Sequence, residues 1–533
     1  MTFFQELLRL KWRLVAYIGL YGLMTSALTA TAVLSGNAMI ALTHFHRNMF
    51  IEAALLLVMV TIAQLALATL TNIDQFVLQR HLNNNIRRQL VANIAKMSYL
   101  TYHRRADAVY TSWLTNDMNT INQQGLRYFS YMIQAIWQVL LSAIVLVNYQ
   151  ISFLPTVTLA ATALLTVPLL YRKRLARAAA EFSHQNERLT KKITDVLAGF
   201  DALFMANRQM LLIQQISHAS DETGQANLHY MQFDMFTQFL INLVNLTSQL
   251  ALLIQAGLLA YHHQLAVGAV VTIYSLGGST FSGLTLLSFS LTTLKSVKPI
   301  FKKFGAAAIT LPSTGQKIGP LAHALKIKQL DFTYGNCREP VLRQLNLTIS
   351  ALTKIAVVGA SGRGKTTFVK LLTGLLQPTH GGIYWDQMPY PEIDSGSLRN
   401  QITYIDQSPY LFNASIRFNI TLGDPFTDRQ LNQVLALCQL TTFVANQPHG
   451  LETILSQNGS NISGGQKQRL VLARGLIRNR RLVITDESTA ALDEPTAIKI
   501  EQLLVTLPNI TLIMITHHLH SQIAKQVDLI IKL

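Results

Sequence analysis

The chain is poor in charged residues and in cysteine. Only 13% of its 533 residues are Asp, Glu, Lys or Arg, whereas soluble proteins carry about 25%. Half of the residues are hydrophobic and the mean hydropathy is +0.28, which points to a membrane protein. The two cysteines, Cys337 and Cys438, lack metal-ligand spacing and predict reduced cytosolic thiols rather than a disulfide.

Acidic residues are fewer than basic ones, 27 against 44, which gives a net charge of +17. A charge of this size suggests nucleic acid, but its distribution argues against that partner. Residues 1–320 hold 24 Lys and Arg against 12 Asp and Glu, and residues 321–533 hold 20 against 15. The excess therefore lies mostly in the hydrophobic half, as the positive-inside bias of a membrane protein predicts. We expect no nucleic acid partner.

Six apolar segments approach the ~20 residues with which a helix crosses a bilayer. They cover approximately residues 14–40, 51–72, 128–148, 152–171, 238–261 and 267–290. The first is too long for the apolar region of a signal peptide, so no cleavable signal is expected. Ionisable residues are nearly absent from the centres of the segments, which weakens a proton-coupled mechanism.

The loops between these segments alternate in charge. The long connections 73–127 and 172–237 carry 7 and 8 Lys and Arg, whereas the short connections carry only Arg47. This asymmetry places the long loops, the N-terminus and the C-terminal half in the cytoplasm. Helical periodicity in the long loops predicts that the membrane helices extend into the cytoplasm and turn at short crosswise helices near 103–118 and 198–212.

A short helix is expected before the first span. Phe3, Phe4, Leu7 and Leu8 share one helical face. Such a face suits a helix that lies in the membrane interface.

A phosphate-binding motif occupies the start of the C-terminal half. The run from Gly359 to Thr367 fits the pattern G-x-x-x-x-G-K-[ST] and lies between a β-branched run and an amphipathic helix. Glycines let backbone N–H groups wrap a phosphate, and the helix N-terminus adds a favourable dipole. Lys365 can reach the terminal phosphates, and the Thr366 hydroxyl can ligate Mg²⁺. The predicted contacts are Gly359, Ser361, Gly362, Gly364, Lys365, Thr366 and Thr367.

Two carboxylates follow an apolar run at 482–485. Asp486 fits a contact to water bound to Mg²⁺, and Glu487 fits the group that orients and polarises an attacking water. An acidic strand end can otherwise cap a helix. The phosphate loop in the same chain makes the catalytic interpretation the stronger one.

With these residues in order, the chain resembles the ATP-binding cassette (ABC) family. The run Asn461-Ile-Ser-Gly-Gly-Gln466 is similar to the family's signature sequence, with Ile462 in place of the usual leucine. Ser and Gly at a helix start present donors to a phosphate. The resemblance therefore implies that nucleotide is also contacted by Ser463, Gly464, Gly465 and Gln466.

Four further positions match the family one by one. Gln407 resembles the Q-loop glutamine, which touches Mg²⁺ and relays to the membrane domain. Asp493 ends a run that resembles the D-loop, and His517 resembles the switch histidine that contacts the γ-phosphate. Tyr334 resembles the aromatic residue that stacks on adenine.

The domain organisation follows. Short β-branched runs at 325–331, 344–350, 354–358, 482–485 and 511–516 predict a largely parallel α/β sheet. We expect an all-α six-helix transmembrane domain of ABC exporter type at 1–304, a linker at 305–324 and an α/β P-loop nucleotide-binding domain at 325–533.

The resemblance also implies a function. In this family the signature of one cassette closes the phosphate-loop site of another, so one cassette needs a second half-transporter chain, identical or different. ATP and Mg²⁺ are the implied cofactors. The expected activity is ATP-driven export across the cell membrane of a lipophilic, amphipathic or peptide substrate, in contact with membrane lipid. A lipid flippase and an ATP-gated regulatory or channel-like protein are the alternatives.

Polar side chains form stripes on three of the spans. They are Gln238, Asn242, Asn245 and Gln249 on the fifth, Gln134 and Gln138 on the third, and Ser275, Ser279 and Ser282 on the sixth. Amides in hydrocarbon need a partner or water. Hydrogen bonding between helices and the lining of a substrate path both remain open.

Overall fold

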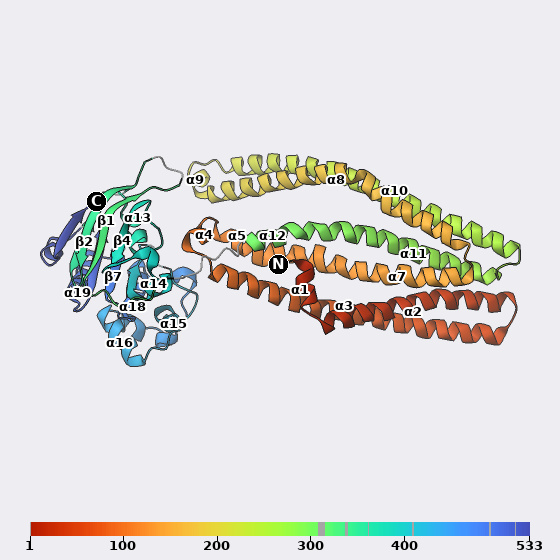
Figure 1. The fold of residues 1–533 in the computed structure, drawn as a ribbon, viewed down its shortest axis with the longest axis horizontal. Coiled ribbons are helices and arrows are strands. Elements are labelled where there is room, and N and C mark those ends of the chain that lie inside the picture. The colour runs from red at the N-terminus through yellow and green to blue at the C-terminus, as the bar shows by residue number, and fades with distance from the viewer. Residues whose placement is uncertain are drawn as a thin grey trace. The chain divides into compact units, whose positions relative to one another are not determined.

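The computed structural model describes residues 2–306, 315–335, 339–360, 362–407, 410–489, 492–517 and 519–533, without the side chains of Pro168, Arg172 and Ala306. It divides into two compact units, which we describe separately (Figure 1). The membrane unit holds the chain up to Met97 and from Arg105 to the end of its last helix. The nucleotide unit combines Ser98–Arg104 with the C-terminal half. Residues 307–314 of the predicted linker, together with Cys337 and Ser361, lie outside the described residues.

The membrane unit is helical throughout (Figure 1). Its main helices are α2 (Trp12–Thr43), α3 (Arg47–Ala95), α7 (Arg127–Tyr149), α8 (Phe153–Ala198), α10 (Met210–Tyr261) and α11 (Val267–Leu294). In the described part of the chain, six helical stretches are long and apolar enough to cross a membrane, one at each predicted position. The predicted six-span architecture is therefore confirmed.

Several helices are much longer than a bilayer requires. Helix α10 has 52 residues and α3 has 49, which at 1.5 Å per residue is roughly 75 Å each. Helix α7 is likewise extended at its N-terminal side by α5 (Asp107–Ser112), α6 (Met118–Thr120) and two π-helical turns. The spans therefore continue well beyond the bilayer, as the periodicity of the long loops predicts.

The first crosswise helix lies earlier than expected. Helix α4 is Tyr99–His103, where the Ser98 hydroxyl accepts a hydrogen bond from the Thr101 N–H at 3.2 Å and so caps the helix. Ala106 is extended, and from Asp107 onward the chain is instead continuously helical into α7. The expectation near 103–118 was wrong because the cap at Ser98 starts the short helix eight residues before Asp107. The second, α9 (Phe200–Met205), lies inside the expected range.

The N-terminal helix α1 (Phe3–Leu8) packs on the membrane unit by one edge. Phe3 and Leu7 are buried, whereas Phe4 and Leu8 are exposed. The buried Glu6 carboxylate accepts a hydrogen bond from Gln89 of α3 at 2.8 Å. The helix therefore presents only part of its apolar face outward, not the whole face that the sequence pattern suggested.

The nucleotide unit contains two sheets rather than one. A parallel sheet has the order β6-β7-β8-β3-β9, formed by Ile402–Ile405, Leu482–Asp486, Thr511–Thr516, Lys354–Val358 and Leu529–Lys532. An antiparallel sheet has the order β2-β1-β4-β5, formed by Leu342–Ser350, Ala324–Phe332, His380–Trp385 and Met388–Pro389. The expectation of a parallel sheet was right for β3, β7 and β8 and wrong for β1 and β2. Strands β7 and β8 are buried along their whole length, whereas β1 and β2 expose many residues, as antiparallel strands can.

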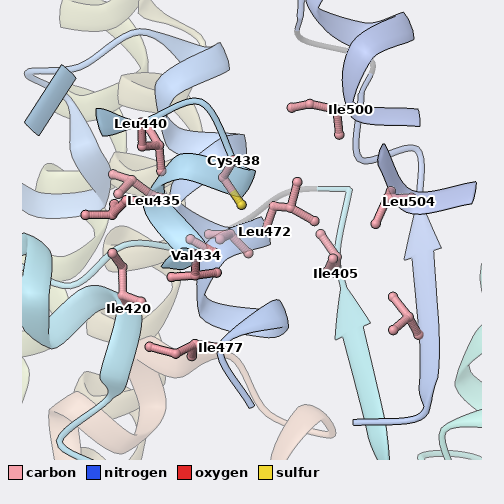
Figure 2. Packing of buried hydrophobic residues seen from close by; sticks show 14 of the residues in the cluster. Ile405, Ile420, Val434, Leu435, Cys438, Leu440, Leu472, Ile477, Ile500 and Leu504 are labelled. Carbon is pink, nitrogen blue, oxygen red and sulfur yellow. The ribbon is translucent and has the colours of Figure 1, made fainter. Parts of the chain in front are cut away.

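Helices flank both sheets (Figure 1). They are α13 (Lys365–Leu372), α14 (Ser395–Gln401), α15 (Ile416–Thr421), α16 (Asp428–Leu437), α17 (Thr441–Ala445), α18 (Gly464–Leu476), α19 (Glu494–Thr506) and α20 (Ser521–Ala524). One hydrophobic core joins α16, α18 and α19 to the parallel sheet, with Leu472, Leu504 and Ile405 inside it (Figure 2). Cys438 is buried in the same core, and burial raises the pKa of its thiol to about 12.

The unit also holds a segment from the membrane half of the sequence. Helix α4 clusters with the nucleotide unit, where the Lys370 Nζ lies 6.0 Å from the centre of the Tyr99 ring. A cation over an aromatic face at this distance is attractive. The first long loop therefore packs on α13, the helix that follows the phosphate loop.

Candidate functional site

The candidate site lies at the carboxyl ends of the parallel strands. Strands β6, β7, β8 and β3 run in the same direction, and Val358 is paired with Thr516 and Asp486 with Ile515. Ligands of open parallel sheets bind at this edge. The order of the strands brings together loops that are more than 150 residues apart in the sequence.

The phosphate loop starts from β3 and ends on α13. Gly362 and Gly364 have φ of +83° and +91°, a region that glycine enters without steric cost. A Cβ at Gly364 would also lie 2.9 Å from Val341 Cγ1. Gly364 is the N-cap of α13, so the dipole of that helix points at the loop. This is the local structure that the glycine pattern predicts.

Four of the predicted residues form one hydrogen-bonded cluster. The buried Lys365 Nζ donates to the Gly359 carbonyl at 2.7 Å and lies 2.9 and 3.0 Å from the two ring nitrogens of His517. His517 Nε2 is 2.6 Å from Glu487 Oε1. Gln407 Nε2 donates to Glu487 Oε2 at 2.6 Å. The cluster places a cation, a carboxylate, an imidazole and an amide beside the phosphate loop.

Glu487 has an unusual backbone conformation. Its φ is +47°, a left-handed value that costs a residue with a side chain about 1–3 kcal/mol. The conformation is held by a hydrogen bond from its N–H to the Ile515 carbonyl of β8 at 2.9 Å. Strain of this kind concentrates at functional sites, where the surrounding structure fixes one geometry.

Asp486 and Thr366 fit the predicted magnesium position. Asp486 is 2% exposed, its Oδ2 has no hydrogen-bond partner, and a hydrogen bond from the Thr366 side chain acts on its carboxyl group. Burial, reinforced by the charges of Glu487 and Asp406, raises the pKa of Asp486 to about 6. A divalent cation would give Asp486 Oδ2 a partner and would offset the negative charges of Asp486, Glu487 and Asp406.

The ligand set also suits this cation. The described residues contain no group of three or more His, Cys, Asp and Glu arranged to hold a metal. Mg²⁺ needs no such group, because in nucleotide sites it keeps several waters and is held by one or two protein ligands and by phosphate oxygens. The residues that would hold it here are Thr366, Asp486 and, through its amide, Gln407. Asp406 was missed by the sequence analysis, although its position directly before Gln407 gave a signal.

Tyr334 lies beside the start of α13. Its hydroxyl is 3.1 Å from Thr367 Oγ1, and its ring packs edge-on against Phe332 with the ring centres 4.8 Å apart. The ring is 38% exposed, so one face remains accessible. Its role in stacking on adenine stays a prediction.

The signature residues start helix α18. The Ser463 hydroxyl accepts from the Gln466 N–H at 3.2 Å, and the Ser463 N–H donates to the Gln466 side chain at 3.0 Å. This reciprocal capping leaves the Ser463 hydroxyl proton free to donate to a ligand. Among the residues that the structure describes, no hydrogen bond joins Ser463, Gly464, Gly465 or Gln466 to the phosphate loop.

Asp493 is occupied in capping α19. Its Oδ2 accepts hydrogen bonds from the Thr496 N–H at 3.2 Å and the Thr496 hydroxyl at 2.9 Å. The hydrogen bond from the Thr496 side chain is the main cause that lowers the pKa of Asp493. Its part in nucleotide binding stays a prediction, and Ser361 lies outside the described residues.

Comparison with known proteins gives several similar chains. The chain is 29% identical over 383 residues, 68% of its length, to the pediocin PA-1 transport/processing ATP-binding protein PedD of Pediococcus acidilactici, and covers 51% of that protein. It is 38% identical over 39% of its length to the lactococcin-G-processing and transport protein LagD of Lactococcus lactis, of which it covers 30%. It thus spans about half of the first relative and about a third of the second. With the ATP-dependent lipid A-core flippase of Wigglesworthia glossinidia brevipalpis it shares 25% identity over 84% of its length, covering 78% of that protein.

The fold and the family agree with these similarities. A bacterial Atm1-family ABC exporter solved with ATP bound superposes with a TM-score of 0.82 at 20% identity, over 99% of this chain and 93% of the other, which shows a shared fold. Residues 14–284 match the family model of the ABC transporter transmembrane region, and residues 342–490 match the ABC transporter family model. The chain therefore belongs to the ABC transporter family, with the membrane and ATP-binding regions of a half-transporter in one polypeptide.

Proposed function

We propose that this chain is one half of an ATP-driven exporter of the cytoplasmic membrane. The observation that carries the proposal is the cluster of Lys365, Glu487, His517 and Gln407 at one sheet edge, in a chain with six membrane-spanning helices. A protein that uses ATP only for gating has no need of a complete set of hydrolytic side chains. The completeness of the set therefore favours a pump over the ATP-gated alternative.

The residues of the cluster divide the chemistry of ATP hydrolysis among them. Lys365, now bonded to the Gly359 carbonyl and to His517, would hold the β- and γ-phosphate oxygens. Glu487 would orient water in line with the γ-phosphorus and accept its proton while the bond to ADP breaks. His517 would donate to the γ-phosphate. Mg²⁺, when bound at Thr366, Asp486 and Gln407, supplies neutralisation of the phosphate charge.

A second chain completes the site in this proposal. The signature helix α18 presents the N–H groups of its first turn and the Ser463 hydroxyl, and neither is bonded to the phosphate loop in the described part of the same chain. A helix N-terminus that carries free donors suits a phosphate from elsewhere. We propose that the γ-phosphate bound in one chain meets Ser463 of its partner, which is either a second copy or a related half-transporter.

Helix α4 offers a route from the nucleotide to the membrane. It belongs to the first long loop but is part of the nucleotide unit, where Tyr99 lies over Lys370 of α13. Movement of α13 on nucleotide binding would therefore reach α3, because only three residues separate the end of α3 from the start of α4. We propose this contact as one step in the coupling.

The amide stripe of α10 supports a polar substrate path. Gln238 donates to Asp234 at 2.7 Å in its own helix, and Gln249 packs at Gly278 of α11. The side chains of Asn242 and Asn245 make no hydrogen bond to another described residue. Hydrogen bonds between helices of this chain therefore do not explain why Asn242 and Asn245 are polar. A water-filled path lined by these amides would explain it, as would contact with a helix of the partner chain.

The substrate class follows from this lining and from the relatives. The stripe is neutral, which suits lipophilic, amphipathic or peptide substrates better than small ions. PedD and LagD are named for pediocin PA-1 and lactococcin G, and the flippases for lipid A-core. We propose a substrate of this amphipathic kind, with lipid flipping as the second candidate because the flippase similarity covers more of the chain.

The test is ATP turnover by the Glu487→Gln variant in reconstituted membranes. Glutamine keeps the hydrogen-bonding reach of Glu487 to Gln407 and His517 but cannot accept the proton of the attacking water. We expect kcat to fall by about 10²–10⁴-fold, while the ATP concentration at half-saturation of binding stays within a few-fold. Near-normal turnover in this variant would refute the assigned role.

A further inference from the structure

A buried carboxylate lies behind the catalytic cluster. Glu501 of α19 is 1% exposed, yet neither the phosphate loop nor the signature involves it. Its Oε1 accepts a hydrogen bond from the Thr489 hydroxyl at 2.8 Å, and its Oε2 lies 2.7 Å from His520 Nδ1. We call this contact the Glu501 bridge. Carboxylate oxygens accept hydrogen bonds, so the Thr489 hydroxyl and His520 Nδ1 are the donors of the Glu501 bridge.

The Glu501 bridge connects the two segments that carry the catalytic residues. Thr489 follows Glu487 by two residues, beyond the end of β7. His520 follows His517 by three residues, beyond the end of β8. Glu487 and His517 themselves meet at 2.6 Å. The two segments are thus joined twice, once at the catalytic pair and once behind it.

The helix that carries Glu501 is a rigid support. Ile500 and Leu504 on either side of it are 2% and 0% exposed and pack in the hydrophobic core (Figure 2). Its N-terminus is fixed by the Asp493 cap. Since α19 is anchored by these contacts, the carboxylate is not needed to hold the helix in place. Its two hydrogen bonds instead hold the segments that reach toward it.

A glutamate at a buried position such as 501 is unfavourable for stability unless it has a function there. A buried carboxylate loses its hydration and is tolerated only with hydrogen-bond partners. Replacing a buried ion pair with an apolar residue of similar volume is often neutral or stabilising. Stability alone therefore gives no reason for a glutamate here, whereas alignment of two catalytic loops does.

We propose that Glu501 is a positioning residue for ATP hydrolysis, which sets the placement of Glu487 against His517 through Thr489 and His520. The inference rests on the proposed ATPase function. Displacing a reacting group by about 1 Å can cost roughly 10²-fold in rate. Loss of the Glu501 bridge should therefore lower kcat while ATP binding, which depends on the phosphate loop, remains.

The experiment compares ATPase kinetics of the full-length protein in lipid nanodiscs for wild type, Glu501→Leu, Glu501→Gln and Glu487→Gln. Leucine removes both hydrogen bonds. Glutamine retains them, because Oε1 can accept from Thr489 and Nε2 can donate to His520 Nδ1 in its other tautomer. We expect the leucine variant to lose about tenfold or more in kcat, with KM for ATP within about threefold, and the glutamine variant to keep at least half of the wild-type kcat.

Two further variants separate positioning from folding. Thr489→Val breaks one arm of the Glu501 bridge at a half-buried position, and we expect a smaller loss of kcat in the same direction, with the melting temperature lowered by only a few degrees because Glu501 keeps His520 as a donor. Lys499→Leu places leucine at an exposed site of the same helix and should leave kcat unchanged.

The possible results are distinct. Wild-type kcat in both Glu501→Leu and Thr489→Val would overturn the proposal. Equal losses in the leucine and glutamine variants would also overturn it, as would a loss of kcat that comes only with a lower melting temperature and weaker ATP binding. If the wild-type protein turned over ATP no faster than Glu487→Gln, the proposed function itself would fail, and this inference with it.

Discussion

Neutralising Asp486 should stabilise the nucleotide unit and at the same time abolish its activity. Burial and the neighbouring charges of Glu487 and Asp406 raise the pKa of Asp486 from 3.8 to about 6. At about 1.4 kcal/mol for each factor of ten, this corresponds to roughly 3 kcal/mol. At neutral pH the ionised side chain therefore costs the folded unit about that much. Asp486→Asn removes the charge but leaves an amide in place of the unpartnered Oδ2, at a cost of about 1 kcal/mol.

The sign of the pH dependence follows from the direction of the shift. Because the pKa of Asp486 is higher in the folded state, the folded protein binds this proton more tightly than the unfolded chain. The resulting stability is complete below about pH 4 and is lost as the pH rises through about 6. The Asp486→Asn variant has no carboxyl group to ionise, so it does not lose this stability as the pH rises. Its net advantage over wild type is therefore about 2 kcal/mol at pH 8 and less than half of that at pH 5.

The assay is thermal unfolding of the nucleotide-free protein at pH 5 and pH 8. For a domain of 150–250 residues, 1 kcal/mol shifts the melting temperature by about 2–4 °C, so we expect the variant to melt roughly 4–8 °C higher at pH 8. The matched control is Glu392→Gln, which removes a charge from an exposed site and should change neither value by more than about 1 °C. An equal shift at both pH values, or none, would refute the argument from buried charge.

Three further outcomes are expected. Lys365→Met should weaken ATP binding at least about tenfold in a filter or fluorescence assay, because a buried cation at the phosphate loop is removed. Gly268→Ala should lower the melting temperature, since its Cβ would lie 2.6 Å from the Ile40 nitrogen of α2, whereas Gly257→Ala meets nothing within 4 Å and should not. The double change Asn242→Leu and Asn245→Leu should leave basal ATPase within about twofold but alter its stimulation by substrates; loss of folding alone would show that the stripe is structural.

Much of the fold could be predicted because the signals were local and strong. Strands β7 and β8 are apolar, β-branched and buried along their whole length, so each stands out as a short hydrophobic run. The six spans stand out for the same reason at greater length. Strands β4, β5, β6 and β9 were missed. Strand β4 opens with His380-Gly-Gly, β6 has four residues, and β9 is largely exposed.

The separation into two sheets could not be read from the sequence. Strands β1 and β2 show the β-branched residues of any strand, and only their partial exposure distinguishes them from the buried parallel strands. Whether two strands pair as parallel or antiparallel neighbours is set by tertiary contacts. The pattern of residues in a single strand does not contain that information.

The nucleotide site shows the same division between local and distant information. The phosphate loop, the Asp486–Glu487 pair and the signature are short runs whose spacing carries their chemistry, and in the structure Lys365, Glu487 and His517 lie in contact. Glu501 has no such context. On sequence alone it is one glutamate in an ordinary helix, typical of a solvated face.

Its role follows only from packing. The hydrophobic neighbours Ile500 and Leu504 fix which side of α19 faces the core. Because side chains follow one another around a helix at fixed angles, this orientation also turns the Glu501 side chain toward the strand ends. There the β7 and β8 segments supply Thr489 and His520 as donors. A residue that binds no nucleotide can thus control turnover, because hydrolysis depends on how two loops are held relative to each other and not only on which side chains they carry.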